Sequence, residues 1–179
     1  PEALRALLDS GKADLLTYGP VGMSSSAVGP SGYRLDRWST DLGRGQRVFA
    51  SARHALGNWQ IQRGAGLVVL ADGPVIVGAI VAMSAPLPVG YVAAVCRVTD
   101  VVDFEHRYGF AYGTLSVHPE QGEESFSVVH RSDDSVTFQI VAVSRPRHPL
   151  ARMFPSIARM LQGRAVDRYL TAMRTAGSV

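Results

Sequence analysis

The feature that most constrains the fold is the segment from Ile61 to Arg145, which is rich in β-branched and aromatic residues and is broken by short turn-forming stretches. The connections between its apolar runs are too short to hold crossover helices, so the strands must pair in antiparallel fashion. Six strands are predicted, at Gly66–Ala71, Ile76–Ser84, Tyr91–Phe104, Arg107–Leu115, Ser125–His130 and Val136–Arg145.

Flanking segments add a further strand and the helices. Tyr33–Asp41 alternates in polarity and is predicted to be the first strand. Gln46–Trp59 carries apolar residues at helical spacing, and Gly57 near its end predicts a short second helix. After Pro149 an apolar stripe continues to about Thr175, which predicts a long C-terminal helix. The stripe comprises Leu150, Met153, Phe154, Ile157, Met160, Leu161, Val166, Tyr169, Leu170 and Met173, and Pro155 predicts a kink or break within it.

The predicted order is one strand, a short helix pair, six strands and one long helix. This order predicts an α+β helix-grip fold, in which a seven-stranded curved antiparallel sheet wraps around the long C-terminal helix, by analogy with START-like and birch-pollen-allergen-like proteins. Such a layout implies a cavity between the sheet and the helix, where an apolar ligand often binds. Fold alone does not fix function.

Residues 1–32 comprise a predicted short helix within Pro1–Leu16, which Gly11 and Lys12 are expected to end, and a loop rich in Gly, Ser and Pro, Gly19–Gly32. We expect this segment to pack on the same domain, with residues 33–179 forming the helix-grip domain.

The charge and cysteine content exclude several function classes. The formal charge of +3 comes from arginines spread along the chain, and Lys12 is the only lysine, so no clustered basic face for nucleic acid is expected. Cys96 is the only cysteine and lies in an apolar stretch, which predicts a buried, unreactive thiol. No secretion leader is visible, and the apolar zone Val75–Met83 is too short to span a membrane. We expect a soluble cytoplasmic protein, and its oligomeric state stays open.

The residues from Arg107 to Phe126 are the densest in chemically useful side chains. The part up to Leu115 reads as a strand in which Gly109 and Gly113 indicate either a bulge or a close approach of another group. The part from Ser116 to Glu124 is predicted to be a loop.

Three carboxylates follow one histidine in that loop: His118, Glu120, Glu123 and Glu124. A zinc site usually has a second His or Cys at defined spacing, and none is close, so no metal is expected. Leu42–Gly45 contains G-x-G but lacks the rest of a dinucleotide fingerprint, so no cofactor is expected either.

The candidate catalytic residues are His118, Glu123 and Glu124, which could serve as acid or base groups. The alternative is that a glutamate here forms a structural ion pair with Arg107 or Arg145. Because Glu123 and Glu124 are adjacent in a strand, at most one of them should face inward.

The candidate ligand-binding residues are Tyr112, Arg145, Trp59 and Phe138. Tyr112 combines an apolar ring with a hydroxyl group, and Arg145 could hold a carboxylate or phosphate or, equally, anchor a loop. Trp59 either lines a pocket or closes the helix in the core. We expect Tyr112 and Arg145 to meet Glu123 or Glu124, with His118 as a further candidate, at one end of the cavity.

Several motifs together resemble one family, the domain of unknown function nineteen-ninety (DUF1990). The resemblance runs from about Thr17 to Tyr169, and one departure is Ser116 and Val117, where the family has Pro and Gly. It supports the fold and the choice of site residues, and implies no established activity. The motifs are TYGPVG (Thr17–Gly22), LGRG (Leu42–Gly45), Trp59, YGFAYGTLSVHPEQGEESF (Tyr108–Phe126) and AVSRPR (Ala142–Arg147).

Two function classes are therefore predicted. The first is a binding protein that holds an apolar or amphipathic small molecule in the cavity. The second is an enzyme of the same fold, a hydrolase, isomerase or cyclase, that uses His118, a glutamate and Tyr112. A third class, a structural partner protein, would show a large exposed apolar patch and no cavity.

Overall fold

The computed structural model describes residues 2–86, 90–147 and 155–178, and gives side-chain surroundings for these residues outside 155–161. The predicted α+β class is confirmed: one sheet of seven strands, all pairs antiparallel, stands against a long C-terminal helix. The spatial order is β1-β7-β6-β5-β4-β3-β2, so only the first strand leaves the sequential meander, by pairing with the last. The strands are β1 (Arg34–Arg44), β2 (Val68–Ala71), β3 (Ile80–Pro86), β4 (Tyr91–Phe104), β5 (Arg107–Thr114), β6 (Glu120–His130) and β7 (Ser135–Pro146).

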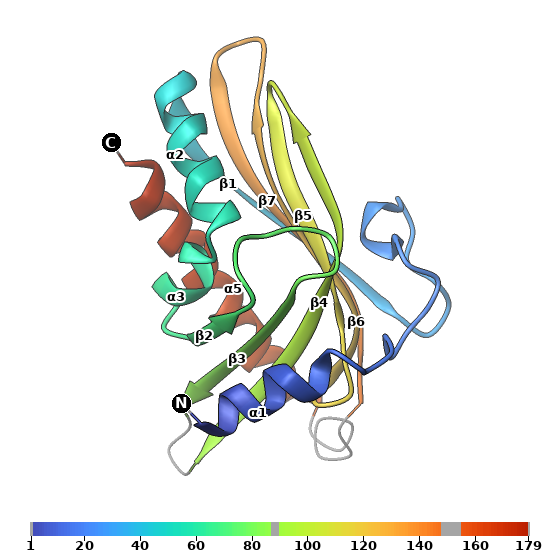
Figure 1. Cartoon of the computed structure of the whole chain (residues 1–179). Helices are drawn as coiled ribbons and strands as arrows, with labels where there is room; N and C mark the ends of the chain where they lie inside the picture. The colour runs from blue at the N-terminus through green and yellow to red at the C-terminus, as the bar shows by residue number, and fades with distance from the viewer. Residues whose placement is uncertain (1, 87–89, 148–154, 179) are drawn as a thin grey trace.

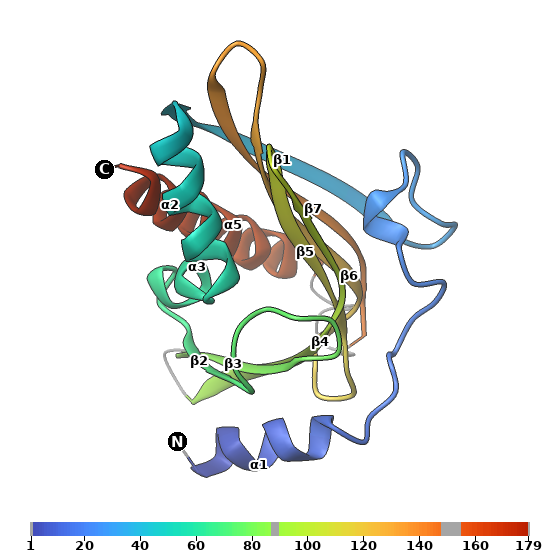
Figure 2. The ribbon, with the colours of Figure 1, turned by 45° about the horizontal axis from the view of Figure 1, so that its top comes forward.

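Helices cover the two faces of the curved sheet unequally. The pair α2 (Gln46–Gly57) and α3 (Gln60–Gly64) lies with α5 (Pro155–Gly177) on the concave side (Figure 1). The helix α1 (Glu2–Gly11) and the 3-10 turn η1 (Met23–Ser25) lie on the opposite, convex side (Figure 2). The helix pair after the first strand is thus confirmed.

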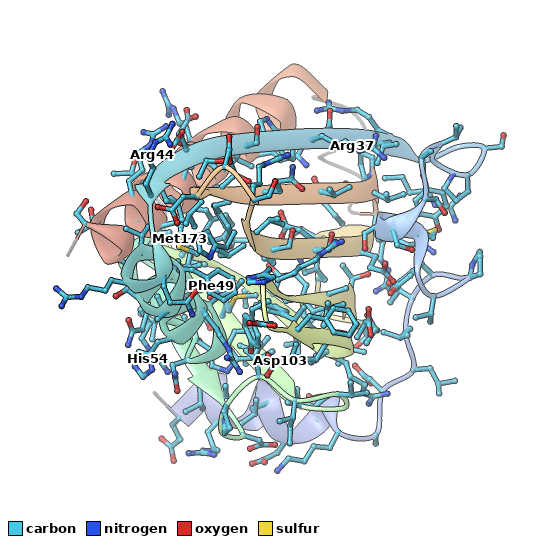
Figure 3. The ribbon with its side chains drawn as sticks, turned by 90° about the horizontal axis from the view of Figure 1, so that it is seen from above. Arg37, Arg44, Phe49, His54, Asp103 and Met173 are labelled. Carbon is cyan, nitrogen blue, oxygen red and sulfur yellow. The ribbon has the colours of Figure 1, made fainter. Side chains whose placement is uncertain are left out.

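The main core fills the space between the sheet and α2, α3 and α5. Phe49 from α2 and Met173 from α5 are buried in it and point toward the strands (Figure 3). Alternate residues of β7, namely Val136, Phe138 and Ile140, supply the facing side, as their period of two predicts.

The predicted apolar stripe of α5 is confirmed where its side chains are described. Val166, Tyr169 and Met173 are buried, Leu170 is partly buried, and Arg164 and Arg174 are exposed. The remaining predicted positions, Leu150, Met153, Phe154, Ile157, Met160 and Leu161, lie outside the described side chains.

A smaller apolar cluster fixes the N-terminal segment to the convex face. Leu4 and Leu8 of α1 pack against Ile80, Val95 and Leu115 of the sheet. This face of β3–β5 is therefore covered and not solvated.

Several element boundaries differ from the sequence prediction; β1, for example, continues to Arg44, beyond the expected end at Asp41. The strand expected from Ile76 begins only at Ile80, because Gly78 has a positive φ of 88° and the chain turns there. The loop expected to continue to Glu124 ends earlier, and β6 begins at Glu120. Pro119 precedes the first residue of that strand, where the missing N–H costs no ladder bond, so it did not prevent pairing.

Bulges help the sheet to curve. The pairing register shifts between Val98 and Asp100 in β4, and between Asp41 and Gly43 in β1. Each bulge adds a residue to one strand and increases the local bend. The curvature opens a space between the sheet and α5.

Candidate ligand cavity

The centre of the candidate site is a pair of residues on neighbouring strands. Tyr112 of β5 lies directly opposite Glu124 of β6 in the antiparallel register, so both side chains leave the sheet on the same face. The Tyr112 hydroxyl donates a hydrogen bond of 2.7 Å to Oε2 of Glu124. The register of two strands, and not a loop, therefore fixes this contact.

A cavity of about 380 Å³ borders this pair on the concave side of the sheet. Its walls come from Leu67 just before β2, from β3–β7, from the β5–β6 connection and from one face of α5, and the surface that they present to the cavity is mainly apolar. The described apolar residues that line it are Leu67, Met83, Ala85, Val92, Ala94, Pro119, Ala142, Ala165 and Val166, and the described polar residues are Ser84, Tyr112, Thr114, His118, Glu120, Glu123, Glu124, Ser144, Gln162 and Tyr169.

Burial controls the electrostatics of the pair. Loss of water raises the pKa of Glu124 to about 7, the neighbouring Glu120 adds to this rise, and the Tyr112 hydrogen bond opposes it. Near neutral pH, Glu124 therefore exists in both protonation states. Burial also raises the pKa of Tyr112, so its hydroxyl keeps its proton and remains a donor.

Two further groups surround the carboxyl. Tyr169 of α5 is buried, and burial raises the pKa of its hydroxyl; its ring packs edge-on against Phe126, 5.6 Å between centroids. Cys96 of β4 is a free, fully buried thiol whose pKa is raised first by burial and then by Glu124. The predicted inert cysteine is thus supported, since a protonated thiol is a poor nucleophile.

His118 borders the same cavity but does not hydrogen-bond to Glu124 within the described part of the chain. Its Nδ1 lies 3.0 Å from the backbone nitrogen of Glu120, which donates to it. The pKa of His118 is lowered to about 4, chiefly by burial; the backbone hydrogen bond with Glu120 opposes this fall and the charge of Arg147 adds to it. The imidazole is therefore neutral at physiological pH.

Glu123, by contrast, points away from the Tyr112–Glu124 pair, to the convex face. Its Oε2 accepts hydrogen bonds from the Tyr18 hydroxyl at 2.7 Å and from the Gly22 N–H at 2.8 Å. Its Oε1 accepts from the Ser24 N–H at 2.9 Å and from the Ser24 hydroxyl at 2.6 Å. This buried carboxylate holds the loop of residues 18–24 against the sheet, so we name the four-bond arrangement the Glu123 clasp.

The glycines of this region mark close approaches. A Cβ at Gly113 would collide with the ring and hydroxyl of Tyr18, and a Cβ at Gly122 would collide with the backbone of Val143. Gly122 also has a φ of 153°, which L side chains rarely adopt. Of the two interpretations of the strand glycines, the close approach of another group describes Gly113.

Arg145 does not reach the cavity, and the expected meeting of Tyr112 and Arg145 at one site is wrong. The guanidinium lies 4.6 Å from the centre of the Tyr33 ring, and its Nε donates a 3.0 Å hydrogen bond to Gln121. Successive residues of a strand point to opposite faces, and Ala142 faces the cavity, so Arg145 faces outward. The alternative that Arg145 anchors a loop agrees better with these contacts.

Trp59 and Phe138, the other expected ligand contacts, are buried in the main core and do not line the cavity. The Trp59 indole donates to the Gly73 carbonyl at 3.0 Å, which satisfies its only donor within the protein. Of the four expected ligand-binding residues, the structure therefore brings Tyr112 alone to the cavity.

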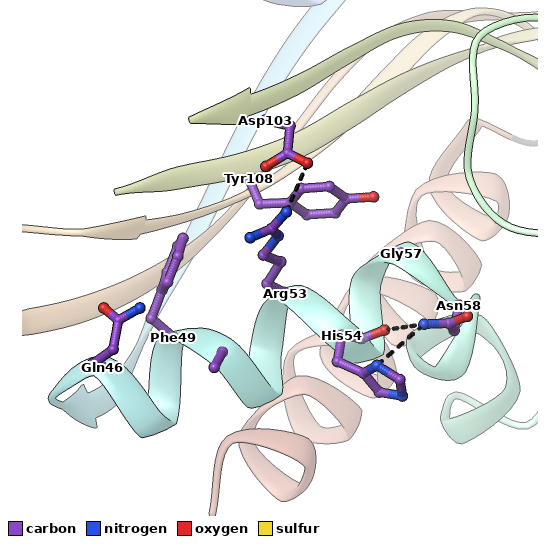
Figure 4. Close-up of a pocket in the computed structure, with 9 residues that line it drawn as sticks. Gln46, Phe49, Arg53, His54, Gly57, Asn58, Asp103 and Tyr108 are labelled. Carbon is purple, nitrogen blue, oxygen red and sulfur yellow. Dashed lines mark hydrogen bonds and ion pairs between the residues drawn. The ribbon is translucent and has the colours of Figure 1, made fainter. Parts of the chain in front are cut away.

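A second hollow, of about 390 Å³, lies on the surface between α2 and the β4–β5 hairpin (Figure 4). Its charged groups pair with each other: Arg53 contacts Asp103 at 2.7 Å and lies 5.6 Å from the centre of the Tyr108 ring. Because its charges are already matched within the protein, this hollow is a weaker candidate than the cavity beside α5.

Three contributors are not predicted from the sequence. In the sequence Tyr169 is visible only as part of the apolar stripe of α5, although a tyrosine in such a stripe carries a hydroxyl that needs a partner. Tyr18 belongs to the TYGPVG motif and Ser24 follows it in the same loop, and neither has a predicted role. Their long separation from Glu123 along the chain hides the clasp from any local pattern.

Comparison with known proteins decides the family. The model of the family described as "Domain of unknown function (DUF1990)" matches residues 17–172. The chain belongs to this family. A "UPF0548 protein" from Deinococcus radiodurans is 35% identical over 82 residues, which cover 45% of this chain and 41% of that protein. The chain thus spans about two fifths of the length of this curated relative.

Solved structures place this DUF1990 member among helix-grip proteins. Human STARD10 matches with a TM-score of 0.53 and 10% identity, over 96% of this chain and 77% of that one. Ginseng major latex-like protein 151 from Panax ginseng matches with a TM-score of 0.51 and 10% identity, over 82% and 99%. At such identity the likeness shows the fold alone, and it confirms the predicted helix-grip, START-like architecture.

None of the helices described is long and apolar enough to cross a membrane. Among the residues that the structure describes, no group of three or more His, Cys, Asp or Glu side chains is placed to hold a metal ion.

Proposed function

We propose that this protein binds an apolar or amphipathic small molecule in the cavity between the sheet and α5. The observation that carries this proposal is the combination of mainly apolar walls with one hydrogen-bonded polar pair, Tyr112 and Glu124, at the same cavity. Small-molecule sites have this composition: apolar walls give affinity and a few placed polar groups fix orientation. A volume of about 380 Å³ lies within the usual range for such sites.

The partner expected here is thus a small molecule, and a cytoplasmic location is part of the same proposal. The buried free thiol of Cys96 is compatible with a reducing compartment.

Native mass spectrometry of freshly purified protein tests the proposal directly, because a bound small molecule adds a discrete mass. A titration with the neutral fluorophore N-phenylnaphthylamine, which brightens in apolar surroundings, covers the case in which the natural ligand is lost on purification. Both measurements need a variant with a blocked cavity and a control variant of equal bulk.

Neighbouring alanines of β4 supply this matched pair. Ala94 lines the cavity and pairs with Met83, whereas Ala93 points to the other face. We expect Ala94→Phe to abolish fluorophore binding and Ala93→Phe to retain it. Equal binding by both variants would show that the ligand binds outside this cavity. Failure of the wild-type protein to bind any apolar molecule would refute the proposed function.

A second candidate function is an enzyme of the same fold, and one observation favours it. A carboxyl group with a pKa of about 7, hydrogen-bonded to Tyr112 beside a cavity, is suited to general acid–base catalysis near neutral pH. His118 is a weaker participant than the sequence suggested, because its lowered pKa leaves it neutral and its Nδ1 already accepts a hydrogen bond.

Chemical change of the bound molecule separates the two functions. If the co-purified molecule is identified and incubated with fresh protein, a binding protein returns it unaltered. An enzyme produces a new compound, seen as a new mass after hydrolysis or as a new chromatographic peak of the same mass after isomerisation or cyclisation, and Glu124→Gln stops its appearance while binding persists.

A further inference from the structure

The described residues that line the cavity supply carboxyl groups but no lysine or arginine side chain. Among the described residues that line it, Glu120, Glu123 and Glu124 carry carboxyl groups, although the Glu123 carboxyl is turned to the convex face, and His118 is uncharged at physiological pH. No described lysine or arginine lines the cavity. The charge of Arg147 lowers the pKa of His118, but Arg147 does not line the cavity, and its Nη1 donates a hydrogen bond to the carbonyl oxygen of Ser116.

Glu124 itself lacks a cationic partner among the described residues. Its Oε2 accepts from Tyr112, and no described group donates to Oε1. The residue is embedded in the protein but keeps a partly accessible surface, and it lines the cavity. An ionised carboxylate in these surroundings lowers the stability of the folded protein unless a cation or a second hydrogen-bond donor contacts it.

Building on the proposed binding function, we propose that the ligand is an amphiphile with a protonated amine, whose ammonium group contacts Oε1 of Glu124 while its apolar part lies along Met83, Val92 and Val166. Tyr112 and Tyr169 also line the cavity, and an ammonium group over either aromatic ring would gain a cation–π contact. A fatty acid or a phosphate ester would place a second negative charge beside Glu120 and Glu124, without a described basic side chain to balance it.

Binding of an amine is then linked to the proton on Glu124. The ammonium favours the ionised carboxyl, so an amine must displace a proton when Glu124 is protonated. The groups facing this carboxyl are Tyr112 from β5, Tyr169 from α5, Cys96 from β4, Glu120 from the start of β6 and His118 from the β5–β6 connection. The first three have raised pKa values and His118 a lowered one, so all four stay neutral between about pH 6 and 8.

Three probes of equal chain length test the inference by displacement of N-phenylnaphthylamine: decylamine, decanol and decanoate. At about pH 8, where Glu124 is ionised, we expect decylamine to bind about tenfold or more tightly than decanol, and decanoate to bind most weakly. Lowering the pH to about 6 should weaken decylamine by several-fold and leave decanol nearly unchanged.

Glu124→Gln should remove the advantage of decylamine over decanol and retain decanol binding. Glu120→Gln, which alters the other carboxyl in the cavity, is the control and should preserve most of that advantage. Equal affinities of decylamine and decanol for the wild-type protein, or tighter binding of decanoate, would overturn the inference while leaving the binding function intact. If none of the three probes displaces the fluorophore and none binds, the proposed function itself fails and the inference falls with it.

Discussion

Glu123 and Glu124 are adjacent in the chain, yet their carboxyl groups lie on opposite faces of the sheet and have opposite surroundings. Glu123 is saturated, with four hydrogen bonds from Tyr18, Gly22 and Ser24. Glu124 has one hydrogen bond, from Tyr112, and borders a cavity. The pleat of β6 separates a structural carboxylate from one that is available for binding, and different experiments should reveal each role.

The Glu123 clasp should contribute measurably to stability. Glu123→Ala leaves four buried or partly buried donors without their acceptor, so we expect the free energy of unfolding to fall by about 3 kcal/mol, measured by urea denaturation. Amide hydrogen exchange should accelerate at residues 18–24, which the clasp holds. Glu105→Gln, a change at an exposed glutamate, is the control and should alter neither quantity. A clasp variant as stable as the wild type would show that these bonds are replaced by water without loss.

Glu124 should make stability decrease as pH rises. Its pKa is about 7 in the folded protein and close to the ordinary 4.5 in the unfolded chain, so the folded state binds more protons between these values. Stability is therefore full below about pH 4.5 and is lost progressively up to about pH 7. In Glu124→Gln this loss is absent, and we expect the variant to gain on the order of 2 kcal/mol relative to wild type between about pH 5 and pH 8. Parallel pH profiles for the two proteins would contradict the raised pKa.

Arg145 should prove dispensable for binding. It lies on the convex face, stacked on Tyr33 and hydrogen-bonded to Gln121. We expect Arg145→Ala to leave the affinity for N-phenylnaphthylamine unchanged and to lower the free energy of unfolding by at most about 1 kcal/mol, because exposed contacts of this kind are weak. Loss of fluorophore binding in this variant would show that Arg145 contributes to the ligand site.

Much of the fold could be predicted from the sequence because its signals are local. The alternation in β7, the helical spacing in α2 and the short turns between strands each depend on nearby residues. The predicted position of Arg145 is wrong for a different reason. Residues at neighbouring strand ends lie close together only if their side chains leave the same face of the sheet, and that face alternates from one residue to the next. Counting from Ala142, which faces the cavity, gives Arg145 the outward side.

The carboxyl site was only half predictable. The adjacency of Glu123 and Glu124 predicted that at most one would face inward, and the structure agrees. Which of the two faces inward depends on the pairing register between β5 and β6. Because the sequence predicts a loop as far as Glu124, it predicts no strand pairing for these residues. The donors of the clasp come from residues about one hundred positions earlier, a distance at which sequence patterns carry no signal.

The packing of α5 on the sheet should be sensitive to its buried face. Met173 is fully buried in the main core, so Met173→Ala should lower the free energy of unfolding by about 2–5 kcal/mol, as large-to-small core changes do. Leu15→Ala is the control, because Leu15 is 84% exposed and its truncation should have little effect. Thermal unfolding followed by circular dichroism measures both, and equal midpoints would contradict the packing of α5.

The Tyr112–Glu124 hydrogen bond should be visible in the titration of Glu124. The Tyr112 hydroxyl stabilises the ionised carboxyl and so lowers its pKa against the larger effect of burial. Removal of the donor in Tyr112→Phe therefore raises the pKa of Glu124 above about 7, and the side chain stays protonated over a wider pH range.

Carbon-13 NMR of protein labelled at the glutamate carboxyl carbons follows this group directly, and Glu124→Gln identifies its resonance. Tyr108→Phe is the matched control, since Tyr108 lies on the same strand and face but opposite Val128, and the Glu124 titration should not move in that variant. A pKa that stays constant or falls in Tyr112→Phe would mean that the hydroxyl does not donate to the carboxylate, and the polar anchor proposed for the ligand would lose its basis.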